Sequence, residues 1–188
     1  MARTGAGAAA ALLLCVGAAQ AADIQVEAEH TDGRFVVRAL AKIDVALETA
    51  WQVITDYGNL SLFIPDMIES RVLSREGNRA VVAQKGRARF LFFSRAIEVM
   101  LEVEEFPVER VVSRATSGDF REMDGAYTLQ RNDAGLELRY EGHIVPNFFA
   151  PPFGATSAVR RLIEGQFRAM VEEILRRGGQ PPEAAPVQ

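Results

Sequence analysis

The sequence contains few of the residues that most often carry redox or metal chemistry. Among its 188 residues are one cysteine, Cys15, and two histidines, His30 and His143. Cys15 lies in an N-terminal segment that we expect to be removed, which leaves no thiolate for a disulfide, a metal or a nucleophile. The two histidines are far apart and lack the acidic neighbours of a metal site. A Gly-x-Ser-x-Gly motif is also missing. We therefore expect no metal, no cofactor and no nucleophilic catalytic residue.

An excess of basic residues is lacking as well. The chain has 21 Lys and Arg against 25 Asp and Glu, a net charge of -4. Binding of a nucleic acid usually requires a basic stripe or patch, so this balance argues against such a partner. The length suits one domain with a sizeable core. Neither an internal repeat nor a linker divides the chain, so we expect one domain over residues 22–177 and a disordered tail over 178–188.

No apolar run in the sequence reaches the length of a membrane span. The run after Arg3 is about 15 residues long and centred on residues 12–14, short of the roughly 20 that cross a bilayer. Ala19-Gln20-Ala21 follows it and has the small-x-small pattern of a signal-peptidase site. Leu14 disfavours lipidation at Cys15, because lipoprotein signals have a small residue there. We predict that residues 1–21 are a cleaved secretory signal and that the protein is periplasmic or secreted, with an uncleaved anchor as the alternative.

Alternating apolar and polar residues predict a series of strands. The alternation is clear at Phe35–Ile43, where every second side chain is apolar, and it recurs along much of the chain. Turn residues such as Asp32-Gly33 separate consecutive strands, and strands joined by short turns pair antiparallel. The strands are expected at residues 24–30, 35–43, 70–74, 79–89, 90–106, 111–117, 122–131 and 136–145.

Two segments have the periodicity of helices instead. In the first, Asp44 is a plausible N-cap and Gly58-Asn59 the expected end, with Leu47, Ala50, Trp51 and Ile54 on one buried face. Pro65 limits any second helix there to about one turn. The last segment has a long apolar stripe and ends at Gly178-Gly179; the stripe comprises Val159, Leu162, Ile163, Gln166, Phe167, Met170, Val171, Ile174 and Leu175. Such a helix must cover an apolar surface, and the predicted sheet is the only large one. The fold class is therefore α+β.

Several short segments resemble the polyketide cyclase/dehydrase and coenzyme Q-binding START-like superfamily. They are residues 50–57, 63–65, 118–120, 125–129, 133–140 and 151–153. The resemblance extends from about residue 35 to residue 177. It implies the helix-grip fold, in which a curved antiparallel sheet wraps around a long C-terminal helix with one or two short helices near the N-terminus. It also implies a hydrophobic cavity between sheet and helix.

Candidate ligand contacts follow from the resemblance and from strand parity. We expect them at Tyr57, Phe63, Phe93, Arg95, Tyr127, Tyr140, Phe149, Phe153, Val159 and Ile163. Arg95 shares the apolar side of its strand, so it either binds a ligand oxygen with its guanidinium or is turned outward by a bulge near Ser94. Asp56 and Tyr57 either line the cavity mouth or support the loop. Residues 148–153 form either a gate that touches a membrane transiently or a buried hinge.

Three functions from different classes agree with these features. The first is an exported carrier of a hydrophobic small molecule: a lipid, an isoprenoid quinone or a polycyclic compound. The second is a cyclase/dehydrase-type enzyme in which Asp56, Tyr57, Arg95 and Tyr140 act on a poly-carbonyl substrate. The third is a module that binds another envelope protein. The carrier is favoured, because binding needs apolar volume and few polar groups. Acid-base catalysis needs a cluster of titratable groups, which the sequence does not indicate.

Overall fold

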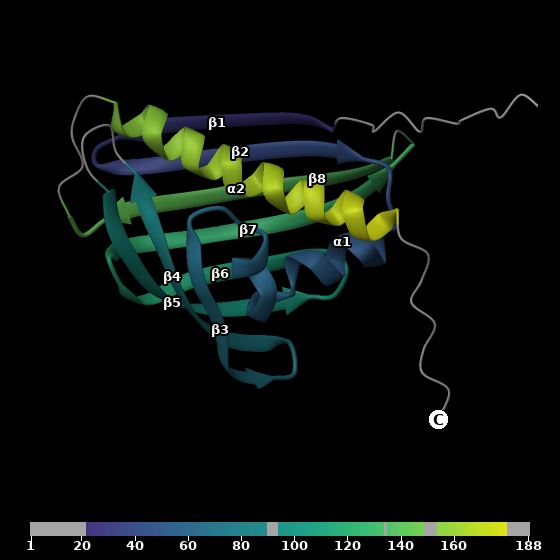
Figure 1. The fold of residues 1–188 in the computed structure, drawn as a ribbon, viewed down its shortest axis with the longest axis horizontal. Coiled ribbons are helices and arrows are strands. Elements are labelled where there is room, and N and C mark those ends of the chain that lie inside the picture. Colours follow the sequence, from purple (N-terminus) through teal and green to yellow (C-terminus); the bar gives the residue numbers. More distant parts are fainter. Residues whose placement is uncertain (1–21, 90–93, 134, 149–153, 180–188) are drawn as a thin grey trace, which may run out of the picture.

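The computed structural model describes residues 22–89, 94–133, 135–148 and 154–179 (Figure 1). Within these residues the strands form one antiparallel sheet in the order β1-β2-β8-β7-β6-β5-β4-β3. The strands are β1 (Asp23–Thr31), β2 (Arg34–Ile43), β3 (Met67–Glu76), β4 (Arg79–Arg89), β5 (Ser94–Phe106), β6 (Arg110–Gly118), β7 (Phe120–Asn132) and β8 (Gly135–Pro146). Most strands pair with their neighbour in sequence, and β2 pairs with β8.

The turn between β1 and β2 shows why these strands form a tight hairpin. Asp32 and Gly33 have φ angles of 53° and 78°. Two consecutive residues with positive φ give a turn whose twist matches that of the flanking strands. The register pairs Thr31 with Arg34, which leaves only the two central residues in the turn. The hairpin predicted at Asp32-Gly33 is confirmed.

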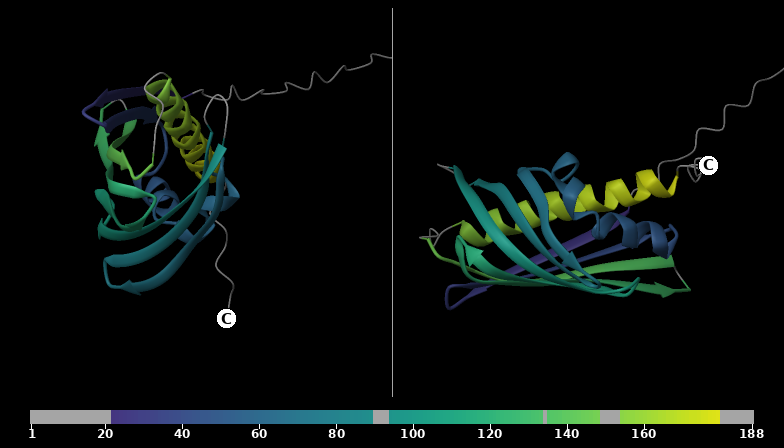
Figure 2. Two further views of the ribbon diagram at one scale, coloured as in Figure 1. Left: turned by 90° about the vertical axis from the view of Figure 1, so that its left-hand side faces the viewer. Right: turned by 90° about the horizontal axis from the view of Figure 1, so that it is seen from below.

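Three helical segments complete the described part of the fold. They are α1 (Leu47–Ile54), the 3₁₀ helix η1 (Tyr57–Leu62) and α2 (Ala155–Gly178). Figure 2 shows the sheet curving around α2, which crosses its concave face. Helix α2 contacts β1, β2, β4 and α1. The predicted helix-grip fold is confirmed.

The predicted ends of the first helix are wrong. Its N-cap is Ala46 rather than Asp44, and no side chain caps it. Helix α1 already ends at Ile54, where the Thr55 hydroxyl donates a hydrogen bond to the carbonyl of Trp51 at 2.8 Å. Gly58 and Asn59 lie inside η1 instead of ending α1, because a second, 3₁₀ segment continues the chain.

Most side chains that the apolar pattern predicted to be buried are buried, and the exceptions lie on α1 and α2. On β2, Phe35, Val37, Ala39, Ala41 and Ile43 are buried as predicted. On α1 the buried side chains are Ala50, Val53 and Ile54, whereas Leu47 and Trp51 are only partly buried. On α2 the fully buried apolar residues are Ala155, Phe167, Met170, Val171 and Ile174. The stripe residues Val159, Leu162 and Ile163 are half-buried, and the reason is the cavity beside them.

The expected signal segment, residues 1–21, and most of the expected tail lie outside the described residues. Gly178 closes α2 and Gly179 is its C-cap, so the helix ends at the predicted place. Among the described helices, none has the length and apolar character needed to pass through a bilayer. The domain boundaries therefore stay predictions.

Candidate ligand-binding cavity

Two adjoining chambers lie between α2 and the concave face of the sheet. The outer chamber has a volume of about 160 Å³ and the inner one about 130 Å³. Their walls have four side chains in common, Met67, Gln84, Met123 and Gln166. These side chains form the boundary between the chambers, which we call the neck. Two of these four side chains are methionines, which are flexible and adapt to irregular spaces.

The outer chamber is enclosed by the first turns of α2 and by the strand ends that face them. Its wall includes Phe35, Phe120, Ile144 and Phe148 from the sheet side, and Ala155, Val159, Leu162 and Ile163 from α2. The structure therefore places the predicted contacts Val159 and Ile163 in the cavity wall. Their incomplete burial is what a helix face next to an unfilled space requires.

The inner chamber lies toward α1 and η1, and its wall contains three tyrosines. Tyr57 of η1, Tyr127 of β7 and Tyr140 of β8 all line it, as do Leu60, Ile64, Leu101 and Met170. No charged side chain is among the described residues of this wall. The predicted contacts Tyr57, Tyr127 and Tyr140 are thus brought together, although they are far apart in sequence.

Tyr57 is held at the end of the inner chamber by a buried carboxylate. Its hydroxyl donates a hydrogen bond to Glu105 Oε1 at 3.0 Å, and Arg75 Nη2 lies 3.0 Å from the same oxygen. Glu105 is buried although it is charged. Burial, and then the Glu105 carboxylate, raise the pKa of Tyr57 above its usual value. Tyr57 therefore both packs and lines the chamber, and it stays protonated.

Glu105 is a residue that the sequence analysis missed. It follows Val99, Leu101 and Val103 on the side of β5 that faces the core, whereas Glu104 faces outward. The alternation of side chains along the strand was therefore enough to predict that this carboxylate faces inward. Its partners Arg75 and Tyr57 come from β3 and η1, and no sequence pattern joins these elements. Parity also places Gln84 of β4 and Met123 of β7 in the cavity wall, which the sequence analysis did not single out.

Arg95 lies at the rim of the cavity. The pairing of β4 with β5 is continuous from Arg79–Glu104 to Arg89–Ser94, so no bulge interrupts this pairing from Ser94 onward. Its Nη2 donates to Asp119 Oδ1 at 2.8 Å, and its guanidinium carbon is 4.8 Å from the centre of the Phe148 ring. It lines neither chamber. The guanidinium is bound to Asp119, and its predicted contact with a ligand oxygen stays a prediction.

The backbone amide of Glu98 also holds the Asp119 side chain in place. This amide donates to Asp119 Oδ2 at 2.9 Å. The hydrogen bond from Glu98, followed by the one from Arg95, holds the pKa of Asp119 below its usual value. Asp119 is therefore ionised and fully engaged at the rim. Neither member of the Arg95–Asp119 pair is placed to act on a molecule in the inner chamber.

Phe63 and Asp56 support the loop around η1. Arg177 Nη2 donates to Asp56 Oδ2 at 2.9 Å, and Asn59 donates to Asp56 Oδ1 at 2.8 Å. The guanidinium of Arg177 also lies 5.9 Å from the centre of the Phe63 ring. Neither Phe63 nor Asp56 lines a chamber. The structural interpretation of Asp56 agrees with this geometry, and the predicted cavity contact of Phe63 does not.

The remaining predicted contacts, Phe93, Phe149 and Phe153, lie outside the described residues. Among the residues that are described, no group of three or more His, Cys, Asp or Glu side chains is placed to hold a metal ion. The described walls of the cavity can thus bind an apolar molecule and donate or accept a few hydrogen bonds. They bring together no acid and base pair.

A family model for polyketide cyclases, dehydrases and lipid transport proteins matches residues 43–173. The chain belongs to this family. The resemblance noted in the sequence is thereby confirmed, and the matched region contains β3 to β8 and most of α2. No curated protein sequence matched the chain.

Solved structures share the fold at low sequence identity. The STAR-related lipid transfer protein from Xanthomonas axonopodis is 16% identical, with a TM-score of 0.64 over 80% of this chain and 93% of that one. The Zhui aromatase/cyclase from Streptomyces sp. R1128 is 14% identical, with a TM-score of 0.62 over 81% and 98%. A START superfamily protein from Mycobacterium smegmatis is 11% identical, with a TM-score of 0.58 over 76% and 96%. At these identities the likeness shows the fold.

Proposed function

We propose that this protein is a non-catalytic carrier that holds a hydrophobic small molecule between α2 and the sheet. The observation that carries this proposal is the pair of adjoining chambers whose walls are mainly apolar. Most natural small-molecule sites combine such a wall with a few polar groups that orient the ligand. The tyrosines of the inner chamber supply these groups.

An enzyme of the cyclase/dehydrase type is the alternative, and the titratable groups argue against it. Burial raises the pKa of Tyr127, and it raises the pKa of Tyr140 to about 12. A general acid or base works best with a pKa near the working pH, so these hydroxyls are poorly suited to transfer protons. Glu105 is bound by Tyr57 and Arg75, which leaves it unsuited to act as a base. The geometry supports binding better than proton transfer.

The chemistry of the walls favours a lipid, an isoprenoid quinone or a polycyclic compound as the ligand. Apolar side chains dominate both chambers, and an apolar molecule gains free energy by leaving water for such a space. Few charged groups are near the cavity: Arg95 pairs with Asp119 at the rim, Lys85 of the outer wall pairs with Glu98, and Arg87 also lines the outer chamber. The third hypothesis, a protein-interaction module, would not need an apolar interior of this kind.

Export of the carrier rests on the N-terminal sequence. The apolar run and the Ala19-Gln20-Ala21 pattern support a cleaved signal. Intact mass spectrometry of the protein from the envelope fraction is expected to show loss of the first 21 or 22 residues. A full-length mass in that fraction would contradict cleavage, and a full-length mass in the cytoplasmic fraction would contradict export.

Binding is tested by extraction and by a charge placed in the wall. The purified protein is expected to release an apolar compound into organic solvent, identified by mass spectrometry, or to bind added quinones or fatty acids. Ile163→Glu places a carboxylate in the outer chamber and is expected to weaken binding at least tenfold, because a buried charge without a partner is costly.

The matched control is Ser157→Glu, which adds the same carboxylate to an exposed position of the same helix. Circular dichroism of both variants verifies that they fold. A wild-type protein that extracts empty and binds none of the hydrophobic compounds would rule out the carrier function. The interaction module would then be the better explanation.

A further inference from the structure

We propose that the inner chamber recognises a neutral carbonyl group through the hydroxyls of Tyr127 and Tyr140, so that the ligand lies with its oxygen inward and its apolar part toward α2. This inference rests on the proposed carrier function and specifies the class of ligand. It is carried by the placement of the two tyrosines, by the absence of a hydrogen bond from either hydroxyl to the described residues, and by the lack of charged side chains in the described wall of the chamber.

The two tyrosines form a cross-strand pair. Tyr127 of β7 stands directly opposite Tyr140 of β8, and their ring centres are 4.8 Å apart. The ring of Phe167 from α2 lies parallel to that of Tyr127, at 6.5 Å between centres and 4° between planes. Strand pairing and helix packing therefore fix the rings before any ligand arrives. Such preorganisation lowers the entropic cost of binding.

Two glycines determine how Tyr140 lies on the sheet. Gly125 and Gly142 are opposite each other on β7 and β8. A Cβ atom on Gly125 would come within 2.9 Å of the Tyr140 hydroxyl, and one on Gly142 within 2.4 Å. The Tyr140 side chain thus occupies the space that two side chains would otherwise fill. Glycine at these positions lets its ring and hydroxyl lie against the concave face.

Within the part of the chain that the structure describes, neither hydroxyl makes a hydrogen bond to the protein. Among the described residues, the side-chain hydrogen bonds include none from Tyr127 or Tyr140. Every buried side-chain nitrogen or oxygen of the described residues has a hydrogen-bond partner. The two hydroxyls therefore remain accessible, and the space that both residues line is the inner chamber. An unused donor in an apolar surrounding favours a ligand that supplies an acceptor.

Three of the other donors in the inner chamber already have acceptors, and the Gln166 amide at the neck is not among these three. The Tyr57 hydroxyl donates to Glu105, Gln84 Nε2 to Ser70 Oγ at 3.4 Å, and the Ser113 hydroxyl to the carbonyl of Gly125 at 3.4 Å. The tyrosine pair is thus left to orient a ligand deep in the chamber, with Gln166 as a further donor at the neck. Burial raises the pKa of both hydroxyls, so that they remain donors at neutral and mildly alkaline pH.

The acceptor that suits this pair is neutral. No Lys or Arg is among the described residues of the inner wall, so a carboxylate or phosphate there would lose its hydration without gaining a cation. A carbonyl oxygen has no charge and two lone pairs, one for each hydroxyl. The apolar part of the ligand then extends past Met123 and Gln166 of the neck to Val159 and Ile163.

Three naphthalene probes of nearly equal size test this inference: 2-acetylnaphthalene, 2-ethylnaphthalene and 2-naphthoate. Their affinities for the wild type, Tyr127→Phe and Tyr140→Phe are measured by fluorescence titration at pH 7. Loss of one hydrogen bond is expected to weaken binding of the ketone roughly threefold to tenfold in each variant and to leave binding of the hydrocarbon unchanged. The naphthoate is expected to bind the wild type at least tenfold more weakly than the ketone.

A second measurement needs no variant. The infrared carbonyl stretch of bound 2-acetylnaphthalene is expected at a lower frequency than in hexane, as a hydrogen-bonded carbonyl requires. A stretch equal to that in hexane, or Phe variants that weaken ketone and hydrocarbon alike, would overturn the inference and leave the carrier function standing. Absence of binding by all three probes would overturn the carrier function together with it.

Discussion

The two halves of α2 differ in how firmly the protein holds them. The C-terminal half packs Phe167, Met170, Val171 and Ile174 into the core, and the Arg177–Asp56 ion pair connects its end to the loop around η1. The N-terminal half begins after Gly154, at a φ of 83° and without a side-chain cap, and it faces the outer chamber. One continuous helix therefore has two roles. Its C-terminal half is packed into the core, and we call this half the anchor; its N-terminal half forms a wall of the cavity.

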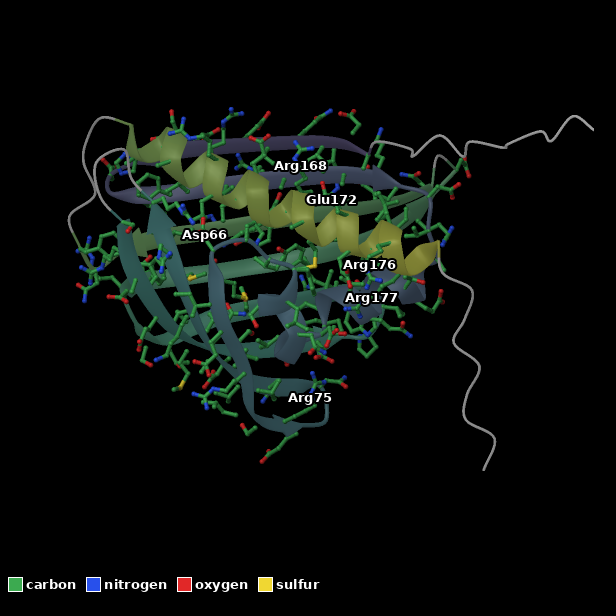
Figure 3. All side chains as sticks on the ribbon, viewed as in Figure 1. Asp66, Arg75, Arg168, Glu172, Arg176 and Arg177 are labelled. Carbon is green, nitrogen blue, oxygen red and sulfur yellow. The ribbon has the colours of Figure 1, made fainter. Side chains whose placement is uncertain are left out.

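The ion pairs at the anchored end centre on Glu173. Arg176 donates to both of its carboxylate oxygens at 2.7 Å, and Arg177 Nε donates to Oε1 at 2.7 Å. Arg177 also reaches Asp56 at 2.9 Å. The arginines lie in the last turn of the helix, where positive charge interacts favourably with the helix dipole. In contrast, Arg168 and Glu172, which are labelled in Figure 3, are exposed.

The largest expected difference between the halves is in stability. Phe167→Ala removes a side chain that is 1% exposed and is expected to lower the free energy of unfolding by about 3–5 kcal/mol. Val159→Ala, in the half-buried wall, is expected to lower it by less than about 1.5 kcal/mol, since its side chain is only partly removed from water. Urea unfolding followed by circular dichroism measures both. Equal losses would show that the cavity wall is packed as firmly as the anchor.

A series of stability measurements at different pH values shows how much Glu173 of the anchor contributes to the free energy of unfolding. Hydrogen bonds from Arg176 lower the pKa of Glu173 from its ordinary 4.5 to about 2, although partial burial opposes the shift. A carboxyl whose pKa is lower in the folded state stabilises it above the ordinary pKa and loses this contribution as the pH falls. Glu173→Gln is therefore expected to cost about 1–2 kcal/mol at pH 7.

The same substitution is expected to make the free energy of unfolding depend less on pH between about pH 5 and pH 2. In this range the wild type loses the stabilisation that ionised Glu173 provides. Thermal unfolding at intervals across this range measures the difference. Glu172→Gln, on the exposed side of the same helix, is the control. A loss of stability at pH 7 that Glu172→Gln reproduces would show that charge on the helix, rather than the Glu173 contacts, is responsible.

Tyr57→Phe tests whether the hydrogen bond between Tyr57 and Glu105, at the end of the inner chamber, stabilises the fold. The substitution removes the donor to Glu105 and leaves the Arg75 contact in place. We expect a loss of about 1 kcal/mol in the free energy of unfolding, as for one hydrogen bond to a carboxylate that keeps another partner. Chemical unfolding provides the measurement. No loss would mean that Glu105 is satisfied by Arg75 alone.

The smallest effect is expected at the rim. Arg95→Ala breaks an ion pair whose arginine side chain is 45% exposed. Exposed pairs contribute little, so the free energy of unfolding is expected to change by about 0.5 kcal/mol or less. Binding of an apolar ligand is expected to stay within twofold of the wild type, by the titration used for Ile163→Glu. A tenfold loss of affinity would restore Arg95 as a ligand contact and would place the site nearer the rim.

Local patterns were sufficient for most of the fold. The alternation at Phe35–Ile43 and the apolar stripe from Val159 to Leu175 each indicated both the element and the side it buries. These signals are local because a strand repeats every second residue and a helix every 3.6. The ends of α1 were predicted poorly, because Asp44 and Gly58 are typical boundary residues whose effect depends on the chain around them.

The sequence by itself determined the helix-grip class and most of the residues that face inward, since both follow from periodicity and from family resemblance. Only the tertiary structure decided which inward residues meet. Strand order and register place Tyr127 against Tyr140, and the packing of α2 brings Phe167 to them. The fold also pairs Arg95 with Asp119, and it brings the Tyr57 hydroxyl within hydrogen-bond distance of Glu105. Such contacts depend on pairings between distant segments, which no local pattern encodes.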